Sequence, residues 1–318
     1  MLFRIILLWL CLICSATLSA SQSETELASH SVLSSVEDCV INALKCKQLA
    51  RRMQLQAPEH STAWFRATYL LMNAMWETDR LSISRSEMAS YVGIPDSPPV
   101  FAATANTIYA KQLISAGEPE TGRQYAKNAA SLLLSMPGSA LTPRRYSDVI
   151  ELYQYLGDYK KAQQLIDEAM AHFSDIKKGY IKADLLMAAG HNAFHFKNWQ
   201  QAFSLYQRSA EAHLEAKSLI GAAVAYANTG RSLQSSEQWS EAEKMLLKSV
   251  SLYDQLNQKS ELRDKFYVQL RLCEVLLAQS KTEQAQKLFA TLNPDSLHTY
   301  HRQIYNKLAL ELTETVSE

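Results

Sequence analysis

Between residues 100 and 294, apolar residues recur every three or four positions in segments that short polar turns separate. This spacing places the apolar side chains on one face of an α-helix. The turns hold residues that end one helix and begin the next, such as Gly117 and Pro119 or Gly157 and Asp158. The pattern predicts five helix pairs: 102–115 with 120–134, 146–155 with 160–173, 182–196 with 200–217, 219–233 with 240–256, and 262–279 with 282–292.

The array has a fixed period. Gly122, Ala162, Ala202 and Ala242 stand forty residues apart, and an aromatic residue lies three positions before each of the last three: Tyr159, Trp199 and Trp239. A fixed period in this range is typical of solenoids, in which each unit buries its apolar face against its neighbours. We therefore expect these small residues where two helices approach each other closely, because a larger side chain would force the helices apart.

The segments before and after the array are also predicted to be helical. Apolar stripes over 36–53 and 63–75, separated by Pro58, predict a helical hairpin, and a short helix is expected over 84–91. The run Gly93–Pro99 breaks the pattern, and a last helix over 296–314 has a polar outer face, which is typical of a solenoid cap. The predicted domains are a signal peptide (1–20), an amino-terminal helical segment (21–99), the repeat array (100–294) and a capping helix (295–318).

The repeat unit resembles the tetratricopeptide repeat (TPR), whose two helices carry small and aromatic residues at fixed places. The best match consists of Gly190, Trp199, Ala202, Tyr206 and Ser209. Equivalent small residues occur in the neighbouring units: Gly157, Ala162, Ala169, Gly230, Ala242, Ser249 and Ala285. The period is forty rather than about 34 residues, as in long-linker repeats of bacterial sensory and regulatory proteins. The resemblance implies an all-α fold, a right-handed α-solenoid of helix pairs.

In this family the first helix of each pair lines a concave groove, and the resemblance therefore implies which side chains face it. The candidate partner-binding residues are Glu151, Gln154, Tyr155, His191, Phe194, His195, Arg231 and Gln234. The same argument places further residues along the groove: Lys111, Ile114, Asp184, Met187, Val224, Tyr267, Leu270, Glu274 and Leu277. An extended peptide or a partner helix would bind there. The alternative is that these side chains form a solvated inner face.

The first twenty residues have the features of a cleaved targeting segment. Arg4 precedes the unbroken apolar run Ile5–Ile13, and small residues follow up to Ala20, after which we place the cleavage. Cys14 suggests a lipoprotein, but Ile13 stands before it where a small residue is needed. The apolar run is shorter than the about 20 residues that span a bilayer. We therefore expect an exported protein without a membrane span, periplasmic in a Gram-negative bacterium or otherwise extracytoplasmic.

Export leaves three cysteines, Cys39, Cys46 and Cys273, in an oxidising compartment. Cys39 and Cys46 lie on one apolar stripe, and seven helical residues rise about 10.5 Å. A disulfide needs Cα atoms within about 7 Å. Either the helix is continuous and both thiols are reduced core residues, or the helix breaks between them and they are bridged. Cys273 occupies the place of Gly190 and Gly230, so we expect a small buried residue rather than a reactive thiol.

Charge and motifs exclude several functions. Lys and Arg balance Asp and Glu at 32 each, so nucleic-acid binding is not expected. His191 and His195 share a helix face as zinc ligands do, but no acidic residue follows His191 and Glu151 is the only candidate third ligand. We expect no catalytic residue, metal or cofactor.

The sequence therefore predicts a non-enzymatic exported scaffold that binds a protein or a peptide in its concave groove. The alternative is a ligand-sensing regulatory module that works with a separate membrane signalling partner. The sequence does not predict the oligomeric state.

Overall fold

The computed structural model describes residues 43–79, 84–137, 142–173, 179–256, 262–297 and 301–314. These residues form fourteen α-helices and no strand, so the fold is all-α as predicted. None of the helices that the structure describes is both long and apolar enough to cross a membrane. The chain divides into two compact units, Met1–Thr78 and Asp79–Glu318. The expected signal peptide (1–20) lies outside the described residues.

The first unit contains the predicted hairpin of α3 (Ala43–Gln56) and α4 (Thr62–Asp79). A buried hydrogen bond joins the two helices, in which Gln54 Nε2 donates to Thr68 Oγ1 over 2.8 Å. Cys46 is 1% exposed and is disulfide-bonded. Cys39, the other member of the pair considered from the sequence, lies outside the described residues.

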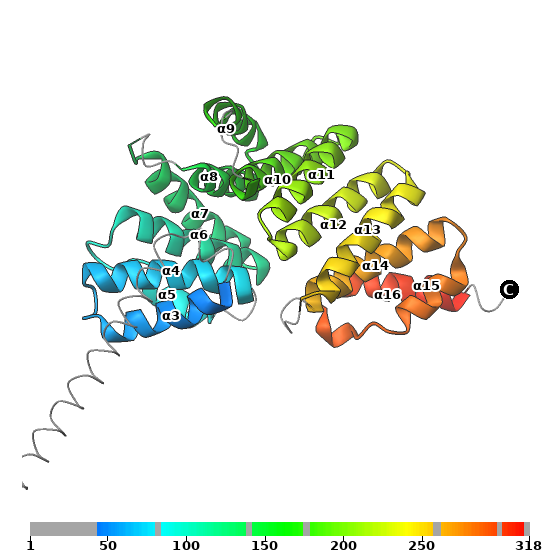
Figure 1. Ribbon diagram of the computed structural model, residues 1–318, viewed down its shortest axis with the longest axis horizontal. Helices are drawn as coiled ribbons and strands as arrows, with labels where there is room; N and C mark the ends of the chain where they lie inside the picture. The colour runs from blue at the N-terminus through cyan, green and yellow to red at the C-terminus, as the bar shows by residue number, and fades with distance from the viewer. Residues whose placement is uncertain are drawn as a thin grey trace, which may run out of the picture. The chain divides into compact units, whose positions relative to one another are not determined.

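The second unit begins with α5 (Arg85–Tyr91) and continues as five helix pairs that follow one another along the chain (Figure 1). The pairs are α6 (Pro99–Ser115) with α7 (Pro119–Leu134), α8 (Pro143–Tyr155) with α9 (Tyr159–His172), α10 (Gly179–His195) with α11 (Trp199–Glu215), α12 (Leu219–Ser235) with α13 (Trp239–Asp254), and α14 (Leu262–Ala278) with α15 (Thr282–Phe289). A 3₁₀ turn, η3 (Pro294–Ser296), and α16 (His301–Glu314) follow. All five predicted pairs are confirmed.

The turns within the pairs repeat one backbone geometry. After each of the first helices from α6 to α12, one residue takes a left-handed φ between 58° and 87°: Gly117, Gly157, Lys197 and Glu237. The next amide donates to the carbonyl five residues earlier over 2.9 Å, as in Asn198 to Ala193, which closes the helix end. The Asn198 side chain then accepts from the amide of Gln201 and caps the second helix.

Small residues lie where the two helices of a pair meet, as the period predicts. Ala162, Ala202, Ala242 and Ala285 are fully buried. At Gly190 the two helices approach so closely that a Cβ atom would lie 2.6 Å from the ring of Tyr206. The forty-residue period therefore reflects helix-to-helix contacts inside each pair.

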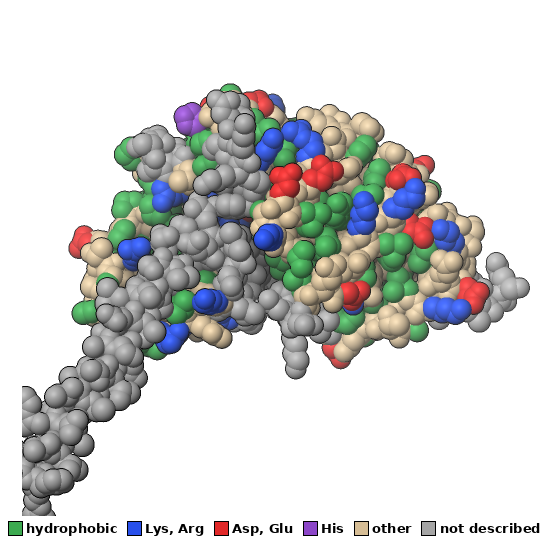
Figure 2. Space-filling model, in the orientation of Figure 1, with side chains coloured by type: hydrophobic (Ala, Val, Ile, Leu, Met, Phe, Trp, Pro, Cys, Tyr) green, Lys and Arg blue, Asp and Glu red, His purple; other side chains and the backbone are tan. Residues whose placement is uncertain are grey.

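The last helix closes the apolar core of the second unit. Leu308 and Leu312 of α16 are buried, and Leu308 packs with Leu270 and Cys273 of α14. The opposite side of α16 is exposed at Arg302, Gln303, Asn306 and Lys307, as expected of a cap. Figure 2 shows charged side chains of both signs interspersed with hydrophobic ones on the face of the molecule in view.

Candidate functional site

Equivalent positions of the five first helices carry polar side chains. The residues forty positions apart on α6, α8, α10, α12 and α14 are Lys111, Glu151, His191, Arg231 and Arg271. One turn further along three of these helices stand Gln154, Phe194 and Gln234. We call these eight residues, together with Tyr155, His195 and Glu274, the inner strip. The inner strip includes all eight candidates predicted from the sequence, which lie on α8, α10 and α12.

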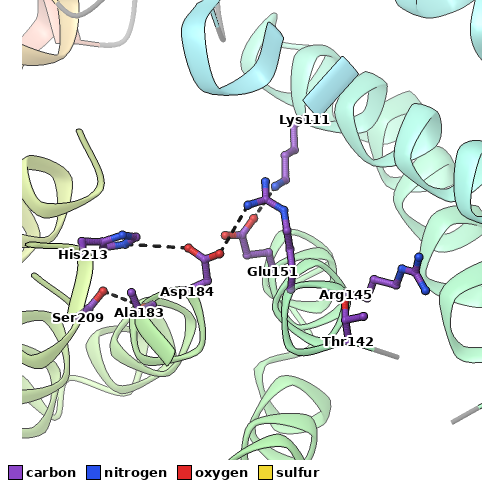
Figure 3. A network of polar contacts seen from close by, with 9 residues as sticks. Lys111, Thr142, Arg145, Glu151, Ala183, Asp184, Ser209 and His213 are labelled. Carbon is purple, nitrogen blue, oxygen red and sulfur yellow. Dashed lines mark hydrogen bonds and ion pairs between the residues drawn. The ribbon is translucent and has the colours of Figure 1, made fainter. Parts of the chain in front are cut away.

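An ion pair joins the first two helices of the inner strip. The ammonium of Lys111 on α6 bonds to the carboxylate of Glu151 on α8, and Figure 3 shows these two side chains pointing toward each other. The Lys111 side chain is 7% exposed and that of Glu151 is 33% exposed. Burial is the largest single influence and lowers the pKa of Lys111, but the charge and hydrogen bond of Glu151 together with Tyr155 and Asp148 outweigh it, so the pKa of Lys111 stands well above its ordinary value. Tyr155 lies beside this pair, with its ring centroid 6.0 Å from Lys111 Nζ.

The centre of the inner strip combines a neutral histidine with a stacked arginine. His191 Nδ1 lies 2.8 Å from the hydroxyl of Tyr206, a residue that is 2% exposed. Burial lowers the pKa of His191 to about 4, Glu151 opposes the shift, and the cations of Arg231 and Lys111 add to it. The guanidinium of Arg231 lies 4.2 Å from the ring centroid of Phe194.

His191 and His195 do not act together. The ring of His195 stacks on Tyr159 at a centroid distance of 3.3 Å and an angle of 5°, whereas His191 bonds to Tyr206. Within the described parts of the chain, no group of three or more His, Cys, Asp or Glu side chains is placed to hold a metal ion. The two histidines therefore contact different aromatic residues.

Side-chain amides of two glutamines connect α8 with α10 and α12 with α14. Gln154 Nε2 donates to the carbonyl of Ala188 over 2.8 Å and lies 3.5 Å from Oδ1 of the fully buried Asn192. Gln234 Nε2 donates to Glu274 Oε2 over 3.0 Å, and Arg271 bonds to the same oxygen over 2.9 Å. The hydrogen bonds of Gln154 and Gln234 thus join α8 to α10 and α12 to α14.

A second group of charges lies one or two turns before the inner strip on α8 and α10. Arg144 Nη1 lies 3.6 Å from Asp184 Oδ2, and the other oxygen of Asp184 lies 3.9 Å from Nε2 of the buried His213 (Figure 3). Gly221 lies against His213, because a Cβ atom at this position would overlap the imidazole ring. The contacts therefore link three successive helix pairs.

Comparison with known proteins identifies the fold. No protein-family model and no curated protein matches the chain. Among solved structures, a Rap protein complexed with competence and sporulation factor is similar, with a TM-score of 0.61, 11% identity, and coverage of 93% of this chain and 78% of that one. A chain of the APC/C hetero-tetramer Cut9–Hcn1 is also similar, with a TM-score of 0.54, 16% identity, and coverage of 86% of this chain and 48% of that one.

The chain has a TPR fold. In TPR terms, α6, α8, α10, α12 and α14 are the first helices of five repeats, and the inner strip runs from one repeat to the next. The described side chains of the inner strip supply hydrogen-bond donors, acceptors and aromatic faces. Cys273 lies outside it, because its side chain is fully buried and burial raises the pKa of its thiol to about 12.

One expectation along the groove is wrong. Leu270 is fully buried in the core with Leu308. Sequence reasoning also missed Arg144 and Arg271, although each stands forty residues from a residue that it did identify, Asp184 and Arg231. Following the period through every first helix would have found both.

Proposed function

We propose that this protein is an exported, non-enzymatic TPR scaffold that binds a protein or a peptide in a concave groove lined by the inner strip. The observation that carries the proposal is the continuity of the inner strip over successive repeats. Lys111 bonds to Glu151, Gln154 reaches α10, and Gln234 reaches α14. These contacts hold the first helices in a fixed register, as a preorganised binding surface requires.

The exposed groups of the inner strip suit a polypeptide ligand. Tyr155 is 41% exposed, and Phe194 and Arg231 are partly exposed. Tyrosine and arginine are enriched among the residues that dominate binding energy in protein interfaces. The two similar folds are consistent with this use, since the Rap protein is complexed with competence and sporulation factor and Cut9 is part of a hetero-tetramer with Hcn1.

Affinity capture with matched variants tests the proposal. The wild-type protein, Tyr155→Ala on the inner strip and Leu247→Ala on the second helix α13 would each serve as bait in the exported fraction of the native cell. Leu247 is 49% exposed, so both substitutions remove an exposed side chain of similar exposure. We expect a protein that the wild type and Leu247→Ala capture equally and that Tyr155→Ala captures several-fold less. Equal capture by all three baits would contradict binding through the inner strip.

Export is tested separately. The amino-terminal sequence of the mature protein, determined after cell fractionation, is expected to begin at Ser21 in the extracytoplasmic fraction. A cytoplasmic product that still carries Met1 would refute export and would leave the binding proposal standing.

A further inference from the structure

The short turns inside the helix pairs lie along one edge of the second unit. Helices α10 and α12 run in the same direction, because α11 returns between them through two tight turns, at Lys197 and at Lys217. The turns that follow α10 and α12 therefore lie on the same side. The ring of His195 stacks on Tyr159, so the α8–α9 turn and the α10–α11 turn are in contact. We call residues 155–161, 195–201 and 235–241 the turn edge.

One position of each turn points away from the protein. It is the residue with the left-handed φ, which is Gly157, Lys197 or Glu237 in three successive pairs. A Cβ atom added to Gly157 would have no heavy atom within 4 Å outside its own chain neighbours. Because the three turns share this backbone geometry, the exposed side chains of Lys197 and Glu237 also leave the turn toward solvent. Neighbouring repeats therefore present a positive and a negative charge from the same position.

The charges of Lys197 and Glu237 are not neutralised by neighbouring side chains. In the described part of the chain, neither of them forms an ion pair. The other carboxylates at the start of α13 are already paired: Glu241 with Lys244 over 2.7 Å, and Glu243 with Lys281 over 2.6 Å. The turn edge thus keeps one cation and one anion that a surface of complementary charge can neutralise.

Aromatic side chains accompany both charges. Phe196 precedes Lys197 and is 52% exposed. Its ring meets that of Tyr159 edge-on at a centroid distance of 6.4 Å. On the α12–α13 turn, Trp239 is partly exposed. Aromatic residues are enriched in protein interfaces, because they bury a large area at a small cost in conformational entropy. Phe196 therefore supplies an apolar anchor beside Lys197.

We propose that two copies of this chain form a two-fold dimer through the turn edge. A two-fold axis places one surface against the same surface of the other copy, so every contact occurs twice. With the axis between the α10–α11 turn and the α12–α13 turn, Lys197 of each copy faces Glu237 of the partner subunit. A second copy has the complementary charges, because the same edge carries both signs at equivalent positions. The dimer does not depend on the proposed peptide-binding function.

Sedimentation velocity of the purified full-length protein tests the dimer. At an ionic strength of about 10 mM, where charges interact over about 30 Å, we expect a dimer that dissociates on dilution. At about 1 M, where this range falls to about 3 Å, the dissociation constant should rise several-fold. Phe196→Ala should raise the dissociation constant about 10-fold or more, because it removes the aromatic anchor.

Charge reversal tests the contact between Lys197 and Glu237 directly. Lys197→Glu and Glu237→Lys each place like charges at both contacts of the dimer, so each variant alone should be monomeric where the wild type is dimeric. An equimolar mixture of the two variants restores opposite charges at both contacts and should form a heterodimer. Lys217→Glu is the matched control, because Lys217 is also exposed with a left-handed φ of 59°. It lies at the other end of α11, about 25 Å away, and this variant should remain dimeric.

Each outcome either supports or overturns the dimer. A wild type that stays monomeric at every concentration would overturn it, and so would a dimer that persists in both single variants, because its interface would lie elsewhere. Monomeric variants with unchanged melting temperatures whose mixture stays monomeric would overturn the pairing of the two residues. Heterodimer formation would support it, since a misfolded variant could not restore the contact. None of these results bears on capture of a partner through Tyr155, so the proposed function is tested separately.

Discussion

Glu151→Gln removes the carboxylate that neutralises the buried ammonium of Lys111. Breaking one side of a buried ion pair costs about 3–5 kcal/mol. Because the Glu151 side chain is 33% exposed while that of Lys111 is 7% exposed, we expect the lower end, about 3 kcal/mol. At about 2–4 °C per kcal/mol for a domain of this size, the melting temperature should fall by about 6–12 °C in a thermal unfolding assay followed by circular dichroism.

The way stability depends on pH provides a second test of the ion pair. In the wild type the pKa of Lys111 is raised above the unfolded value of about 10.4. Its contribution to stability is therefore fully present below about pH 10 and is lost as the pH rises through the folded pKa. Because burial without Glu151 lowers the pKa of Lys111, the difference in stability between the wild type and Glu151→Gln should be largest near neutral pH and should shrink as the pH rises toward and beyond about 10.4.

A double variant provides the control. Lys111→Met with Glu151→Gln removes both charges and leaves an apolar side chain of similar length, so most of the lost stability should return. A single variant that melts within about 2 °C of the wild type, which corresponds to less than about 1 kcal/mol, would refute a stabilising ion pair. A double variant as unstable as Glu151→Gln would refute the argument from buried charge.

Three further predictions test the repeat geometry. Gly190→Ala places a methyl group 2.6 Å from the ring of Tyr206, so urea denaturation should show a loss of about 1–3 kcal/mol; an unchanged midpoint would contradict the close approach. Lys197→Gly relieves a left-handed backbone with φ of 58° and should raise stability by up to about 1 kcal/mol in the same assay; destabilisation would contradict it. Cys273 should not react with a thiol reagent at about pH 8 in the folded protein and should react fully in denaturant; rapid labelling of the folded protein would show that the thiol is accessible.

The helix pairs were predictable because each repeat contacts mainly its neighbours, so the local apolar period and the forty-residue repeat carry most of the information. The first residue of some helices was predicted less accurately. Residues 102 and 146 were predicted to begin helices that in fact begin at Pro99 and Pro143. The run that ends at Pro99 was interpreted as a helix break, but at the first position of a helix the missing N–H of proline costs nothing.

Most of the inner strip was predictable, because the resemblance to TPR indicates which face of each first helix lines the groove, although Arg271 was missed. The contacts that these side chains make were not predictable. His195 stacks on Tyr159 of the preceding repeat, and Leu270 turns into the core against α16 rather than toward the groove. Both depend on how neighbouring repeats and the cap pack against each other, which no single repeat encodes.

Site-specific photocrosslinking tests the binding role of the inner strip most directly. A benzoylphenylalanine residue replaces Tyr155 on α8 in one protein and Leu247 on α13 in another, positions that are 41% and 49% exposed. After irradiation in the native cell, we predict one discrete protein or peptide adduct from position 155 and none from position 247. The same adducts from both positions, or an adduct from position 247 alone, would contradict the account.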